Sequence, residues 1–199
     1  SICFMSGNVE ARVGRPSLNR LTSNIEEMKS YMGIDTVIKG NFKNISFNTS
    51  SHLELVEFIE NAILETKANI IFTHHPSDLN NDHYHTSISC QAASKLSQRR
   101  NDVTELKELL FMEVLSATDW SLNTSLKQFT PNVFIEIKEK RLIKKIKALD
   151  IYDGVMRDYP HPRSEESIRG LAAYRGSQSG SIYAEAFESL FRKVDFSLI

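Results

Sequence analysis

The sequence predicts an α/β fold: a Rossmann-like, three-layer α/β/α architecture with a mostly parallel sheet. Short apolar runs alternate with segments of helical spacing through most of the chain, the pattern of a parallel sheet covered by helices. The apolar run 68–73 has no polar alternation, as is typical of a strand at the centre of a parallel sheet. The length of 199 residues suits one domain, so we treat 1–199 as a single domain.

The first part of the chain predicts a strand, a helix and a second strand. Residues 2–5 form an apolar run that ends at the turn-forming Ser6-Gly7-Asn8. Apolar side chains recur at helical spacing over 17–32, and Gly33 is placed to end that helix. A second strand is expected at 35–40.

The middle of the chain predicts a second helix, a third strand and a third helix. Ser51 and Glu54 have the spacing of a capping box, in which each residue's side chain bonds the other's backbone N–H. The third strand is the run 68–73, and the third helix is expected at 84–97. The predicted buried face of the second helix consists of Leu55, Val56, Ile59, Ile63 and Leu64.

The last part predicts two more strands, at 109–115 and 133–137, and two more helices. Helix 138–150 is amphipathic, and its basic residues are interpreted as a solvated face. Ser164 is placed to cap the last helix. The tail 183–196 is apolar enough to dock on the rest of the fold.

Composition excludes several classes of protein. With 24 basic and 25 acidic residues, the chain lacks the basic excess of a nucleic-acid binder. No run of about 18 apolar residues occurs, so no membrane span is expected. Cys3 and Cys90 make no disulfide framework, which favours a reducing, cytoplasmic setting. No G-x-G-x-x-G follows a strand, which argues against a dinucleotide-dependent oxidoreductase.

Residues 74–83 hold three of the six histidines, together with two aspartates and two asparagines. They follow a predicted strand, and ligands of parallel sheets bind beyond the carboxyl ends of strands. Histidine and carboxylate are ligands that suit zinc. The segment therefore predicts either a metal or acid/base site, or a loop whose short polar side chains satisfy its own backbone.

The run His74-His75-Pro76-Ser77-Asp78-Leu79-Asn80-Asn81-Asp82-His83 resembles a signature of the LmbE/PIG-L family of zinc-dependent deacetylases. Residues 129–134, 159–164, 174–178 and 183–187 resemble further stretches of that family, in the same order. The resemblance covers about residues 4–194. It implies an LmbE-like fold and a hydrolase that uses Zn²⁺ and a metal-activated water to remove the acetyl group from an N-acetylglucosamine-type sugar. The resemblance implies as substrate a small molecule that is a free N-acetyl sugar or its nucleotide- or lipid-linked conjugate.

The sequence departs from the family at its beginning. The family opens with a strand that leads into Ala-His-Pro-Asp-Asp-Glu, which supplies two zinc ligands and the general base. No such run occurs here, and the chain enters an apolar run directly after Ser1 without an initiator Met. We therefore expect the family's first strand to be absent through N-terminal truncation and the 199 residues to be inactive by themselves.

The resemblance assigns roles to four residues near the expected metal. His83 falls where the family places its remaining zinc ligand. Asp82 resembles an acidic neighbour that tunes the polar network, and it is also suited to cap a helix. Asn80 stands where some members carry a histidine that polarises the substrate amide. Tyr183 resembles a tyrosine near the metal, although a packing role fits it equally well.

Substrate binding is assigned to Arg12, Asp78 and Arg163. Arg12 has the spacing of a substrate-contacting arginine in relatives. Arg163 and Arg175 have the chemistry to hold a sugar phosphate or nucleotide diphosphate, or to form structural ion pairs. The alternative function is a non-catalytic carbohydrate or nucleotide-sugar binding module with a degenerate metal site. The oligomeric state stays open, and a homo-oligomer is compatible with the sequence.

Overall fold

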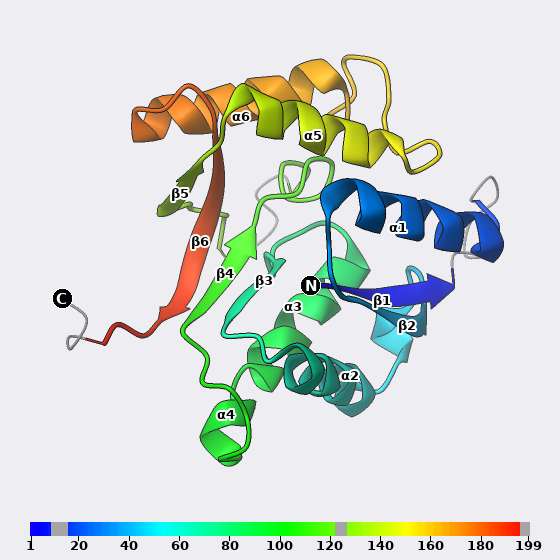
Figure 1. Ribbon diagram of the computed structural model, residues 1–199, viewed down its shortest axis with the longest axis vertical. Helices are drawn as coiled ribbons and strands as arrows, with labels where there is room; N and C mark the ends of the chain where they lie inside the picture. The colour runs from blue at the N-terminus through cyan, green and yellow to red at the C-terminus, as the bar shows by residue number, and fades with distance from the viewer. Residues whose placement is uncertain (9–15, 122–126, 196–199) are drawn as a thin grey trace. The chain divides into compact units, whose positions relative to one another are not determined.

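The computed structural model describes residues 1–8, 16–121 and 127–195, and helices alternate with strands along them (Figure 1). In chain order the elements are β1 (Ile2–Asn8), α1 (Leu18–Met32), β2 (Val37–Lys43), the 3₁₀ turn η1 (Phe47–Thr49), α2 (His52–Thr66), β3 (Ile70–His74), α3 (Asn81–Ala93), α4 (Leu96–Arg99), β4 (Glu108–Met112), β5 (Val133–Glu136), α5 (Glu139–Asp150), α6 (Glu165–Ser179) and β6 (Ala184–Arg192). The predicted α/β class is confirmed. No helix among these elements is long and apolar enough to cross a membrane.

The elements fall into two compact units. The first comprises Ser1–Asn44 and Phe134–Ala186, and the second comprises Ile45–Val133 and Phe187–Ile199. The residues from His74 to His83 all belong to the second unit, so the candidate metal site lies within it.

In the first unit, β1 and β2 form a parallel pair in which Cys3 lies opposite Ile38. Strand β1 continues through residues 6–8, which the sequence predicted to be a turn. Helix α1 has the predicted ends: the Ser17 side chain accepts from a backbone N–H of the first turn, and Gly33 has a left-handed φ of 70°. Helix α5 contacts both α1 and α6, and Ser164 caps α6 as predicted.

A four-stranded sheet has the order β3-β4-β6-β5. Strands β3 and β4 are parallel, with Thr73 opposite Phe111. Strand β6 runs antiparallel to β4, with Phe187 opposite Met112. The C-terminal tail that the sequence predicted to dock is therefore a strand, which completes a mixed sheet.

Strand β3 lies at an edge of this sheet, whereas the sequence predicted a central position. Its only hydrogen-bonded neighbour among the described residues is β4. Ile70 and Phe72 remain 47% and 46% exposed. The prediction was wrong because a run of apolar residues indicates only that the faces of a strand can be buried. It does not show that both edges of the strand are paired.

Helices α2 and α3 pack against each other, and α3 also contacts β3 and η1. The predicted capping box of α2 is present, with the Glu54 carboxylate accepting from the backbone N–H of Ser51 at 3.3 Å. The predicted buried face is confirmed for Leu55, Val56, Ile59 and Ile63, whereas Leu64 is half-buried. This packing fixes the position at which α3 begins, directly after the histidine-rich segment.

Candidate metal centre

The start of α3 places His83 in the first helical turn. The Asn80 side chain accepts from the backbone N–H of Asp82 at 2.9 Å and so caps the helix. The helix begins at Asn81, three residues before the predicted start. The side chains of that first turn are polar, so the spacing of apolar residues does not reveal that the helix begins there. Asn80 is nevertheless a recognisable capping residue.

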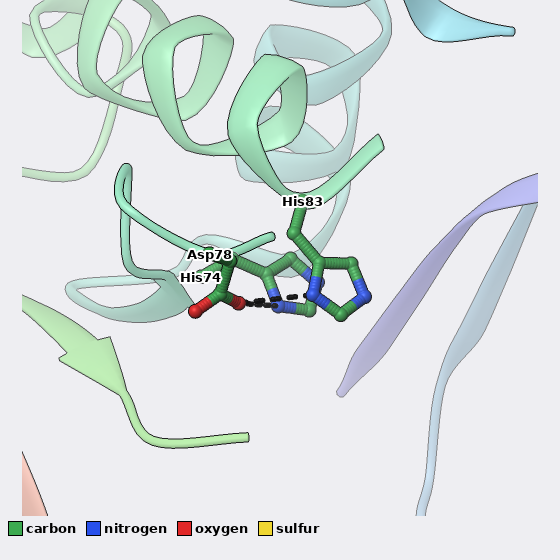
Figure 2. A group of neighbouring side chains, drawn as sticks. All are labelled: His74, Asp78 and His83. Carbon is green, nitrogen blue, oxygen red and sulfur yellow. Dashed lines mark hydrogen bonds and ion pairs between the residues drawn. The ribbon is translucent and has the colours of Figure 1, made fainter. Parts of the chain in front are cut away.

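Three side chains meet between the end of β3 and the start of α3 (Figure 2). The Asp78 Oδ2 atom lies 2.9 Å from His83 Nδ1 and 3.9 Å from His74 Nδ1. One potential ligand atom from each side chain lies within 4.8 Å of the others. Two imidazoles and a carboxylate form a donor set that zinc accepts. The family resemblance indicated His83, but it gave no reason to select His74.

The Asp78 carboxylate is fully buried, and both of its oxygens have partners. Its Oδ1 atom accepts from Thr118 Oγ1 at 2.6 Å, while Oδ2 contacts His83. Thr118 Oγ1 in turn accepts from the backbone N–H of Val114 at 2.8 Å. Asp78, which was predicted to bind substrate, is therefore hydrogen-bonded to His83 through one oxygen and to Thr118 in the turn after β4 through the other.

The ring of His74 stacks on the ring of His83, with centroids 3.8 Å apart and planes 6° apart. Burial lowers the pKa of His74 to about 3, and the neighbouring His83 adds to the effect. His74 is therefore neutral at neutral pH. Its Nδ1 atom is buried and makes no hydrogen bond with the described residues.

A second buried histidine, His75, lies beside Glu188 of β6. Its Nδ1 atom accepts from the backbone N–H of Ser77 at 3.1 Å, and its Nε2 atom lies 3.5 Å from Glu188 Oε2. Glu188 also accepts from the Thr130 N–H at 3.0 Å and forms an ion pair with Lys127. Burial lowers the pKa of His75, while the Glu188 carboxylate opposes that shift. Sequence reasoning missed Glu188 because it lies in the C-terminal strand.

A cavity of about 360 Å³ adjoins both clusters, since His75 and Thr118 contribute to its wall. Its described lining is polar except for one aromatic ring. It consists of His75, Ser77, Glu113, Thr118, Asp119, Ser121, Gln128 and Phe129. The hydroxyl, amide and carboxylate groups suit a ligand with many hydroxyl groups.

Asp82 and Asn80 lie beside His83 in sequence but have other partners. The Asp82 carboxylate accepts from the backbone N–H groups of Ile45 at 2.5 Å and Phe47 at 3.1 Å. The Asn80 oxygen is used in capping α3. The arrangement therefore gives Asp82 a part in holding the loop before α2.

The remaining predicted site residues are Arg12, Arg163 and Tyr183. Arg12 is outside the described residues. Tyr183 and Arg163 belong to the first unit. Arg169 and the hydroxyl of Tyr183 both bond the carboxylate of Glu139 and lower its pKa. The backbone N–H of Arg163 donates to Nδ1 of His161 at 3.0 Å.

Neither a scan of protein-family models nor a search of curated proteins gives a match to this chain. Solved structures do match it. N,N′-diacetylchitobiose deacetylase from Pyrococcus horikoshii aligns with 100% of this chain and 76% of its own, at 14% identity and a TM-score of 0.68. The conserved protein TT1542 from Thermus thermophilus aligns over 94% of this chain and 81% of its own, at 17% identity and a TM-score of 0.72.

A third structure with this fold is described as GalB, the 4-carboxy-2-hydroxymuconate hydratase of Pseudomonas putida KT2440. It aligns over 98% of this chain and 84% of its own, at 16% identity and a TM-score of 0.69. At these identities the likeness establishes the fold, which in these neighbours is associated with more than one reaction. The chain therefore has the three-layer α/β fold of these structures, the fold that the LmbE/PIG-L resemblance implies.

Proposed function

We propose that the protein is a zinc-dependent deacetylase that hydrolyses the acetamido group of an N-acetylated sugar. The observation that carries the proposal is the contact between His83 and the buried carboxylate of Asp78, beside a polar cavity. The same fold occurs in a structure described as N,N′-diacetylchitobiose deacetylase.

The surroundings of His83 suit a zinc-binding imidazole on their own chemistry. His83 offers an imidazole that is 21% exposed, next to a carboxylate and a second, neutral imidazole. When bound, zinc would lower the pKa of a coordinated water and polarise the acetyl carbonyl.

The chain's own residues have separate roles in this proposal. His83 holds the metal, and the cavity wall binds sugar hydroxyl groups through Asp119, Ser121 and Gln128. Asn80 is proposed to stabilise the oxyanion through its amide N–H, since its side-chain oxygen already caps α3. Catalytic roles for Asp82 and Tyr183 remain proposals from the family resemblance, as do substrate contacts of Arg12 and Arg163.

The test measures acetate release from N-acetylglucosamine and from UDP-N-acetylglucosamine in the presence of zinc. It uses the protein as it is expressed from its own gene. We expect release to require zinc, to stop with a chelator and to be lost in His83→Ala. The matched control is His85→Ala, which removes the same kind of side chain two residues along α3.

Two results would count against this proposal. Acetate release that is equal in His83→Ala and unaffected by a chelator would exclude His83 as a zinc ligand in catalysis. Sugar binding without acetate release or zinc uptake would instead favour the carbohydrate-binding module. Because acetate is measured directly, a hydratase activity, as described for GalB, would not be mistaken for deacetylation.

A further inference from the structure

We infer that Asp78 and Thr118 form a positioning relay, a chain of two hydrogen bonds that keeps the proton of His83 on Nδ1. The Nε2 atom of His83 is then left as its metal-binding atom. His74 stacks on His83 and is not a ligand. The metal part of this inference rests on the proposed function. The protonation part concerns the protein without metal and stands independently.

The relay begins at Thr118, whose hydroxyl has one hydrogen to donate. The Val114 N–H already donates to Thr118 Oγ1 at 2.8 Å, so the hydroxyl hydrogen is free to point elsewhere. It is directed to Asp78 Oδ1, which lies 2.6 Å away. This bond orients the carboxylate and leaves Oδ2 facing His83.

The second step follows from the chemistry of a carboxylate. An ionised carboxylate only accepts hydrogen bonds, and a neutral imidazole carries a hydrogen on one of its two nitrogens. In a neutral His83 ring, the 2.9 Å contact between Asp78 Oδ2 and His83 Nδ1 therefore places that hydrogen on Nδ1. The Nε2 atom keeps its lone pair. Figure 2 shows that the other ring nitrogen of His83 points away from Asp78.

The burial of Asp78 favours a single orientation of its carboxylate and of the His83 ring. The Asp78 side chain is fully buried, whereas His83 is 21% exposed. Burial strengthens the bond between them, because the surroundings screen charge less than water does. Carboxylates that accept from the second nitrogen of a metal-binding histidine fix its ring and tautomer in this way.

The stacked rings decide between this arrangement and direct binding by all three side chains. An imidazole binds a metal along the in-plane lone pair of its nitrogen, with a zinc–nitrogen distance of about 2.0 Å. The His74 and His83 planes are 6° apart and their centroids are separated by 3.8 Å. One ion cannot lie in two parallel planes that are stacked on each other. Direct binding by both histidines would require a ring to turn and the Asp78–His83 bond to break.

The first test determines the His83 tautomer by long-range ¹H–¹⁵N NMR on the full 199-residue chain without metal. We expect the hydrogen on Nδ1 in the unmodified chain. In Asp78→Asn, the Thr118 hydroxyl still donates to the amide oxygen, which turns the amide NH₂ toward His83. The hydrogen of His83 should then move to Nε2. A hydrogen on Nε2 in the unmodified chain would overturn the inference.

Thr118 is tested with a matched pair of variants. Thr118→Val keeps the shape but removes the hydroxyl, so we expect a mixture of the two His83 tautomers. Thr118→Ser keeps the hydroxyl and should retain the hydrogen on Nδ1. The same pure Nδ1–H tautomer in Thr118→Val would remove Thr118 from the relay.

The second test measures zinc affinity by competition with a coloured chelator. We expect Asp78→Asn to weaken binding by about 10- to 100-fold, the usual effect of losing such a partner. His74→Phe keeps an aromatic stack without a nitrogen, and its affinity should stay within about twofold, whereas His83→Ala loses binding. A His74→Phe variant as weak as His83→Ala would make His74 a ligand and overturn its stacking role. If the protein expressed from its own gene binds no zinc, the proposed function fails, and the tautomer measurement still decides the relay.

Discussion

The carboxylate of Asp82, at the start of α3, accepts a 2.5 Å hydrogen bond from the backbone N–H of Ile45, a residue 37 positions earlier. Ile45 has a φ of 59°, which is unusual for a β-branched residue. A second bond from Phe47 to the same carboxylate ties down the adjoining turn. Asp82 thus holds a strained backbone segment against α3.

We expect Asp82→Ala to lower the free energy of unfolding by about 2–4 kcal/mol, because two backbone donors lose a charged acceptor. Asp82→Asn should cost less, since its amide oxygen replaces one acceptor. Urea denaturation measures both. The control is the exposed Asp102→Asn, whose partner Arg100 is also exposed, with an expected effect within about 0.5 kcal/mol. An Asp82→Asn chain of unchanged stability that loses acetate release would support the catalytic role implied by the family resemblance.

Helix α6 contains two glycines that should respond in opposite directions to alanine. A Cβ atom at Gly176 would lie 2.6 Å from the backbone oxygen of Ile182, so Gly176→Ala must displace the following turn. At Gly170 nothing lies within 4 Å of that position. Thermal unfolding should therefore show a lower Tm for Gly176→Ala. Gly170→Ala should gain up to about 1 kcal/mol from helix propensity. Equal effects at the two sites would contradict the close approach at Gly176.

Buried His75 should make the protein less stable in acid. Because burial lowers its folded pKa below 6.5, the unfolded chain binds a proton that the folded chain does not. The contribution of neutral His75 to the free energy of unfolding is therefore complete above about pH 6.5 and decreases as the pH drops below that value. Glu188 and Asp78 oppose the shift, while Lys127 adds to it.

The measurement is urea denaturation at pH 7 and pH 5. His75→Asn keeps an acceptor for the Ser77 N–H and removes the titrating ring, so its stability should fall less between the two values. The control change on α3, His85→Asn, should leave the pH dependence of the unmodified chain in place. A His75→Asn chain with the full acid loss would mean that other groups cause it.

The capping box of α2 provides a local test of stability. Ser51→Ala removes the side chain that accepts from the third residue of the helix and should cost about 1 kcal/mol. Ser50→Ala, one residue earlier and outside the box, is the control. Chemical denaturation of the two variants should separate them, and equal stability would show that the cap contributes nothing measurable.

Sequence reasoning succeeded where a structure is determined by neighbouring residues. The caps at Ser51 and Ser164 and the helix end at Gly33 depend on residues within one or two helical turns. The start of α3 was predicted three residues too late for a local reason: the first turn of the helix is polar, and the cap at Asn80 was not recognised.

The contacts that organise the site could not be read from spacing. Thr118 lies 40 residues from Asp78, and Asp82 and Ile45 are joined across a helix and a strand. No periodicity selects such pairs, since they depend on how segments far apart in the chain pack together. The same limit explains Glu188, whose place beside His75 follows from the pairing of β6 with β4.

Among the described residues β3 pairs with another strand on one side only, which has a practical consequence for handling the protein. An unpaired strand edge offers backbone donors and acceptors to a strand of another molecule, and the apolar side chains of Ile70 and Phe72 add an attractive surface. We expect concentrated solutions of the 199-residue chain to aggregate through this edge. Ile70→Lys should delay the rise in light scattering, because a charged edge residue discourages strand addition.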